Sequence, residues 1–172
     1  TLTIALTLLS VLSMSRAAAL HPATVSAETC EKWATHSFPR LRFDWDEPNH
    51  KLIELADTIA GIHHRTAEWT YPDSERPGAA QVVFCDAGVP NPDGSPSVYS
   101  TVTDLLVERG VSRGDIGLVH DIADPARRQP MWDAVRSGHI RVLIGSTKQM
   151  GVGVNIQTRL YAMHEVTAPY RP

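Results

Sequence analysis

Residues 145 to 157 read GSTKQMGVGVNIQ and combine residue types that suit contact with a phosphate-bearing ligand. Ser146 and Thr147 offer hydroxyl groups as well as backbone amides. Gly151 and Gly153 carry no side chain, so a ligand can approach their backbone more closely than at other residues. The pattern predicts a loop whose hydroxyls and backbone amides face a phosphate.

The spacing of this loop differs from two common phosphate-binding motifs. It is neither the G-x-G-x-x-G of a dinucleotide fold nor the G-x-x-x-x-G-K-[ST] of a phosphate loop. Neither hydride transfer nor independent ATP cleavage therefore follows from it. Asn155 can both donate and accept hydrogen bonds, which suits a sugar hydroxyl or a neighbouring loop. Taken alone, the segment fits a glycine-rich turn between a strand and a helix as well as it fits a binding site.

The elements that must position this loop are predicted by the periodicity of apolar residues. Apolar residues at helical spacing predict a helix from about 49 to 68, with Asn49 as its N-cap. Short apolar runs further along the chain predict strands over 81–86, 116–121, 140–146 and 160–166. Amphipathic segments between the strands predict helices over 97–110 and 125–138. Each of these two helices is expected to stop at its final glycine, and Pro130 is expected to delay or kink the second.

This alternation predicts an α/β fold with a parallel sheet and helices on both faces. In such a sheet, the loops at the carboxyl ends of the strands collect the ligands. The expected ligand-binding loops are 85–94, 120–125, 145–157 and 166–172.

Composition restricts the class of function. The chain has 172 residues, a formal net charge of -3 and 42% hydrophobic residues, which fits one domain with an appendage. No global positive field favours nucleic acid, so any contact with it must be made locally by a few groups. The two cysteines cannot form a disulfide framework, which favours a reducing, cytoplasmic compartment.

The first 27 residues imitate a secretory signal, with an apolar core followed by small residues. No positive residue or initiating Met precedes the apolar run, and Arg16 lies where a signal is usually neutral. The run from 1 to 15 also falls short of the roughly 20 apolar residues of a membrane span. We expect neither export nor a membrane partner. Residues 1–48 are expected to form a partly helical appendage to a domain over 49–172.

Four stretches along the domain over 49–172 resemble one family. They are VVFCD at 82–86, VHD at 119–121, RVLIGST at 141–147 and TAPYRP at 167–172. In this order they resemble the second RecA-like lobe, or helicase C-terminal domain, of superfamily-two helicases and DNA translocases. The similarity is greatest to the Swi/Snf-like branch of bacterial and phage DNA-methylase-helicase proteins. It covers 49–172, with its specificity mainly in 141–172, and implies a RecA-like sheet.

The resemblance also implies roles for individual residues. Thr147 takes the place of the family's threonine that contacts the nucleic-acid backbone. The residues implied to bind nucleic acid are Ser146, Thr147, Lys148, Arg127 and Arg128, the two arginines on a helix that follows His120 and Asp121. A solvated helix face explains the arginines equally well. The residues implied to face the nucleotide are Gly151, Gly153, Asn155 and Gln157.

ATP with Mg²⁺ is the cofactor that the resemblance implies, and DNA and a first RecA-like lobe are the implied partners. The family's first lobe carries most of the ATP site, and a helix with the arginine finger follows the position of Pro172. This sequence lacks both, so the resemblance implies a truncated lobe. A supplied arginine can be worth about 10³ to 10⁵ in rate. We expect no significant ATP hydrolysis by this chain alone.

Two other classes of function remain as alternatives. One is a catalytically silent module that keeps the fold and binds a protein or nucleic-acid partner. The other is a nucleotide-sugar or dinucleotide enzyme, which would need a glycine spacing and an acidic ribose ligand that are missing. A metal site is not expected, because no histidine here has zinc-ligand spacing and the adjacent His63 and His64 point in different directions on a helix.

Overall fold

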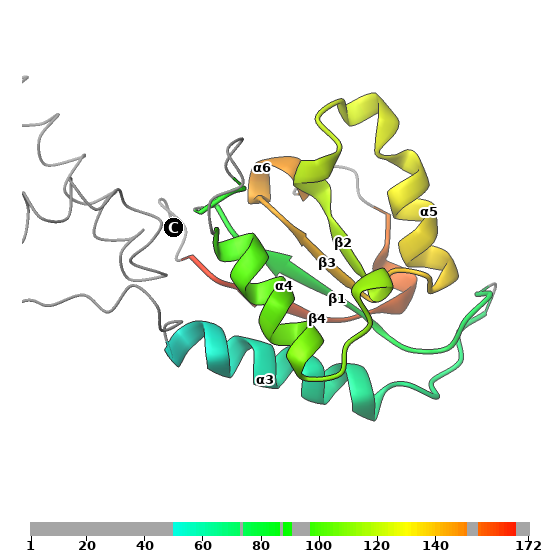
Figure 1. Ribbon diagram of the computed structural model, residues 1–172. Helices are drawn as coiled ribbons and strands as arrows, with labels where there is room; N and C mark the ends of the chain where they lie inside the picture. The colour runs from blue at the N-terminus through cyan, green and yellow to red at the C-terminus, as the bar shows by residue number, and fades with distance from the viewer. Residues whose placement is uncertain (1–49, 73, 87, 91–96, 151–154, 168–172) are drawn as a thin grey trace, which may run out of the picture.

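The computed structural model describes residues 50–72, 74–86, 88–90, 97–150 and 155–167, and these contain a four-stranded sheet (Figure 1). Its strands are β1 Ala80–Phe84, β2 Ile116–Leu118, β3 Val142–Gly145 and β4 Leu160–Glu165. The order across the sheet is β2-β3-β1-β4, and every neighbouring pair is parallel. The predicted parallel sheet is confirmed. Strand β2 ends earlier than predicted because Val119–Asp121 forms a 3₁₀ turn.

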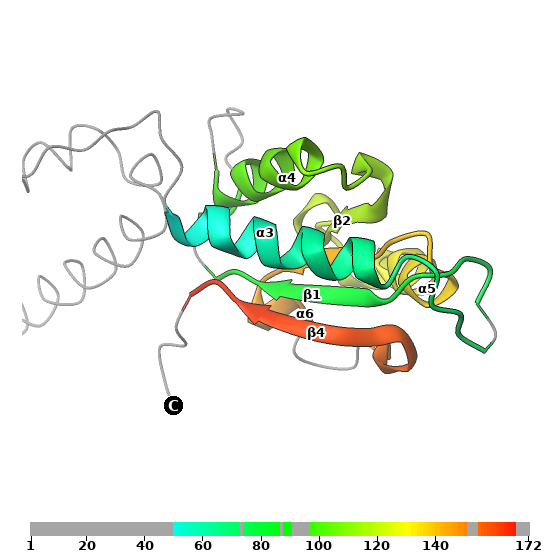
Figure 2. The ribbon, with the colours of Figure 1, turned by 90° about the horizontal axis from the view of Figure 1, so that it is seen from below.

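Helices cover both faces of the sheet, as predicted (Figure 2). The two helices on one face are α3 His50–Arg65 and α4 Val98–Glu108. Those on the other face are α5 Gln129–Ser137 and the four-residue α6 Thr147–Met150. Neighbouring residues of one strand point to opposite faces, so Val83 packs in the core with α3 and α4, and Val82 with α5 and α6. The sheet is therefore the middle layer of an α/β sandwich, as in a RecA-like lobe.

Sequence signals account for the helix boundaries. Helix α4 begins at a capping box in which the side chains of Ser97 and Ser100 bond to each other's backbone amide. Helix α5 begins after a 3₁₀ turn at Pro125–Arg127, with Pro130 in its first turn, which confirms the delayed start. It ends at Gly138, whose φ of +90° places it in the left-handed region. The predicted N-cap Asn49 lies outside the described residues.

Two buried arginines hold the chain at the amino ends of the strands. Arg141 donates through Nη2 to His63 O at 2.6 Å and to Thr66 Oγ1 at 3.1 Å. Arg159, which is 1% exposed, donates through its two terminal nitrogens to Arg76 O and to Gly78 O. These bonds fix the segment between α3 and β1 against the sheet. Burial lowers the pKa of both guanidinium groups.

One buried and one half-buried histidine, His63 and His164, lie against and in the sheet. Burial lowers the pKa of His63 and also that of His164. His164 Nε2 lies 3.0 Å from Gln81 Oε1, while Gln81 Nε2 donates to Ile59 O. Since the amide oxygen of Gln81 can only accept, His164 donates through Nε2. This chain of bonds joins β4 through β1 to α3.

Candidate functional site

Three strand ends meet in one hydrogen-bonded cluster at the carboxyl edge of the sheet. Asp86 lies just beyond β1, Thr147 just beyond β3, and Thr167 just beyond β4. The Asp86 carboxylate accepts from Thr147 N at 2.7 Å and from Thr147 Oγ1 at 2.9 Å. The Asp86 amide donates to Thr167 Oγ1 at 3.1 Å. The order of the strands makes these three ends neighbours, because β1 lies between β3 and β4.

Thr147 and Lys148 are exposed at this edge, in the first turn of α6. Ser146 is half-buried, and Gln149 Oε1 accepts from its amide at 3.2 Å and from its hydroxyl at 3.1 Å. Of the three residues predicted to contact nucleic acid here, Thr147 and Lys148 are therefore the accessible ones. Both donors of Ser146 bond to Gln149 of α6, as both donors of Thr147 bond to Asp86, so exposure is what distinguishes Thr147 from Ser146.

The end of β2 contributes an aromatic contact to the same edge. The ring of His120 lies 6.3 Å from that of Tyr99, edge to face. The Tyr99 hydroxyl donates to Cys85 O at 2.8 Å, and burial raises its pKa, so it stays protonated. Tyr99 thus ties α4 to the end of β1 and supports the backbone immediately before Asp86.

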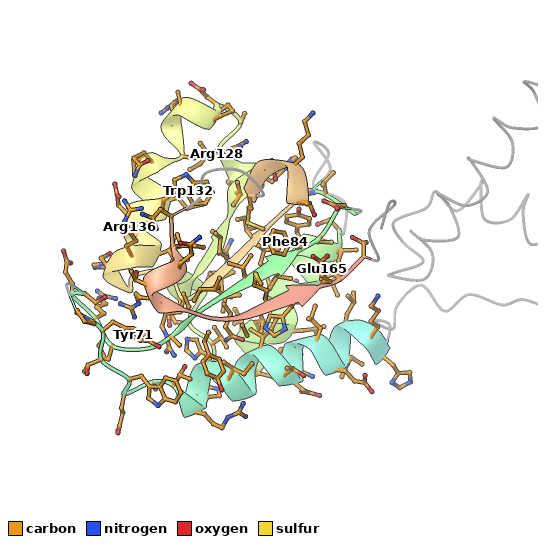
Figure 3. The ribbon with its side chains drawn as sticks, turned by 180° about the vertical axis from the view of Figure 1, so that it is seen from behind. Tyr71, Phe84, Arg128, Trp132, Arg136 and Glu165 are labelled. Carbon is orange, nitrogen blue, oxygen red and sulfur yellow. The ribbon has the colours of Figure 1, made fainter. Side chains whose placement is uncertain are left out.

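The two arginines before α5 lie in different surroundings. Arg127 is exposed. Arg128 is buried, and its guanidinium donates to Ile122 O at 3.0 Å and to Ala123 O at 3.5 Å (Figure 3). A guanidinium buried in this way braces the loop after β2 and is not available to a phosphate. We therefore leave Arg128 out of the candidate interface and keep Arg127.

Of the residues predicted to face a nucleotide, the structure describes Asn155 and Gln157, and Gln157 lies at the opposite end of the sheet from Thr147. Gly151 and Gly153 lie outside the described residues. Gln157 begins the 3₁₀ turn that leads into β4, so it lies at the amino end of the sheet. Asn155 is exposed, and its backbone oxygen accepts from Arg136 in the last turn of α5 at 3.0 Å. The connection from β3 to β4 must cross the sheet from one end to the other, because the two strands are parallel to each other.

Gln157 therefore does not share a site with Thr147 at the carboxyl edge. The described ranges also contain no group of three or more His, Cys, Asp or Glu residues placed to hold a metal ion. Among the helices that the structure describes, none is long and apolar enough to cross a membrane.

Asp86 and Thr167 are the residues that sequence reasoning missed at this edge. Asp86 lay at the end of a predicted strand, and Thr167 lay within a loop expected to bind ligands. The available signal was position: a polar residue directly after a buried strand of a parallel sheet lies at its carboxyl edge.

No protein-family model, curated protein or solved structure matches the chain.

Proposed function

We propose that this chain is the second RecA-like lobe of an ATP-dependent DNA helicase or translocase, and that it contacts the nucleic-acid backbone at its carboxyl edge. The observation that carries the proposal is the position of Thr147 and Lys148. Both are exposed to solvent just beyond β3, which is an inner strand of the sheet. The family resemblance of the motifs around them supports it. In the proposed full-length protein, which is cytoplasmic, a first RecA-like lobe supplies most of the binding site for Mg²⁺-ATP.

The chemistry at this edge suits a phosphate backbone rather than a particular base sequence. A backbone amide, a hydroxyl and an ammonium group are the types of donor that contact phosphates and position a protein on nucleic acid. The net charge of -3 and the small number of donors imply few phosphate contacts. Binding by this chain should therefore be weak and should decrease as salt increases.

Replacing Thr147 by alanine tests the proposal. The change is expected to weaken binding of a fluorescein-labelled single-stranded DNA by about tenfold at low salt, because hydrogen bonds to charged groups contribute about 1.5 to 3 kcal/mol. Fluorescence anisotropy measures the affinity. The matched control is Thr158→Ala, which removes an exposed threonine hydroxyl at the amino end of β4 and should leave affinity unchanged. Equal losses in the two variants would contradict the assignment of Thr147.

One observation favours a second candidate, the catalytically silent interaction module. Asp86 accepts from both the amide and the hydroxyl of Thr147, so neither donor is open to a ligand in this structure. A chain that binds no DNA even at low salt would support the protein-binding form of this second candidate over the first.

A further inference from the structure

The Asp86 carboxylate occupies the position at Thr147 where the proposed function requires a DNA phosphate. One carboxylate oxygen of Asp86 accepts a hydrogen bond from the Thr147 amide at 2.7 Å, and the other accepts from the Thr147 hydroxyl at 2.9 Å. A phosphate that uses the same two donors would have to bring its oxygens to the same positions. Carboxylate and phosphate cannot both occupy them, and their like charges repel at this range.

We infer that Asp86 is an internal competitor for the backbone phosphate at Thr147, so that DNA binds there only after the Asp86 carboxylate turns away. The inference rests on the proposed function, since it concerns the same site. In this inference, Asp86 controls how tightly the lobe binds a DNA strand.

The surroundings of Asp86 allow its side chain to turn while its backbone stays in place. The residue is exposed, so the released carboxylate can be solvated by water. Its amide remains bonded to Thr167 Oγ1, and the Tyr99 hydroxyl holds the carbonyl of Cys85 just before it. The carboxylate can therefore leave Thr147 without disturbing β1 or β4.

Asp86→Asn is the first test, measured as the affinity of the 172-residue chain for a fluorescein-labelled oligothymidine at low salt. An amide side chain keeps the size of Asp86, lacks its charge and accepts through one oxygen only. The expected result is about tenfold tighter binding, since a charge-assisted competitor has been replaced by a neutral one. Asp86→Ala should change affinity in the same direction.

A matched control separates competition from a general change of charge. Asp121→Asn removes the same charge from the end of β2 on the same edge, at an exposed residue. It should increase affinity much less than Asp86→Asn. Equal increases would mean that net charge alone acts and would overturn the inference. Weaker binding by Asp86→Asn would overturn it too, because Asp86 would then position Thr147 for the ligand.

The double variant Asp86→Asn with Thr147→Ala links the gain to Thr147. If Asp86 competes for the two donors of Thr147, the gain should become smaller when the hydroxyl is removed, because only the amide is then left to compete for. A gain that persists in full would contradict the inference. The proposed function and the proposed role of Asp86 can fail separately. If the unaltered chain binds DNA but Asp86→Asn has no specific effect on affinity, only the role of Asp86 is refuted. No binding by either chain refutes the proposed function together with it.

Discussion

Replacement of Arg159 by alanine is expected to lower the free energy of unfolding by about 3 kcal/mol or more. The guanidinium is 1% exposed and donates to the carbonyl oxygens of Arg76 and Gly78. A buried carbonyl left without a donor, as Gly78 O would be, costs about 1 to 3 kcal/mol, and the lost side chain leaves a cavity. The Arg159 Cζ atom also lies 5.0 Å from the centre of the Tyr71 ring, a cation–π contact that the substitution removes.

Chemical denaturation followed by tryptophan fluorescence measures this loss, and two further variants locate its cause. Arg159→Met refills most of the volume but supplies no donor, so it should recover only the part of the loss that is due to the cavity. Arg127→Ala removes an exposed arginine and should change stability by no more than about 0.5 kcal/mol. A loss for Arg159→Ala as small as that for Arg127→Ala would show that the buried guanidinium does not hold the segment before β1.

Gly138→Ala is expected to destabilise the fold by about 2 to 5 kcal/mol. Gly138 has a φ of +90°, in the left-handed region that disfavours a side chain. An added Cβ would also lie 2.7 Å from Arg76 O and against the guanidinium of Arg159. The backbone oxygen and the buried arginine cannot both move away without breaking their own hydrogen bond. Thermal unfolding of the purified variant measures the effect.

Gly110→Ala isolates the conformational part of this cost. Gly110 has a φ of +81°, but the atoms nearest to its added Cβ belong to the His64 ring, at 3.7 and 3.8 Å. Its substitution should cost about 1 to 2 kcal/mol from backbone strain alone. If Gly138→Ala proved no more harmful than Gly110→Ala, the close packing of Gly138 against Arg76 and Arg159 would be contradicted.

The layered fold could be predicted from sequence because its signals are local. Helix α3 shows an apolar stripe, α4 has its capping serines, and α5 ends at a glycine with positive φ. The four-residue α6 was missed because four residues contain too few apolar positions to show a helical period. Strand pairing was not specified by the sequence either, since the order of strands depends on how the crossovers pack.

The candidate site was harder to predict because it depends on contacts between distant parts of the chain. Thr147 could be selected from its motif, but its partner Asp86 is 61 residues away. In the sequence, Arg127 and Arg128 are two adjacent basic residues that look alike. Only the folded structure shows that Arg128 is buried and Arg127 is exposed. Asn155 and Gln157 are close to Thr147 in sequence, yet the crossover between parallel strands carries Gln157 to the opposite end of the sheet.

The location of DNA on the folded chain tests the central claim most directly. Backbone amide signals of the ¹⁵N-labelled protein should be followed by NMR while a single-stranded oligothymidine is added at low salt. The largest shifts are expected at the carboxyl edge, at Asp86, Thr147 and Lys148. The amino end offers a rival surface, because Arg76 is exposed there and Arg136 and His139 are half-buried. Shifts concentrated around those three residues, with the signals of Thr147 unchanged, would contradict the account.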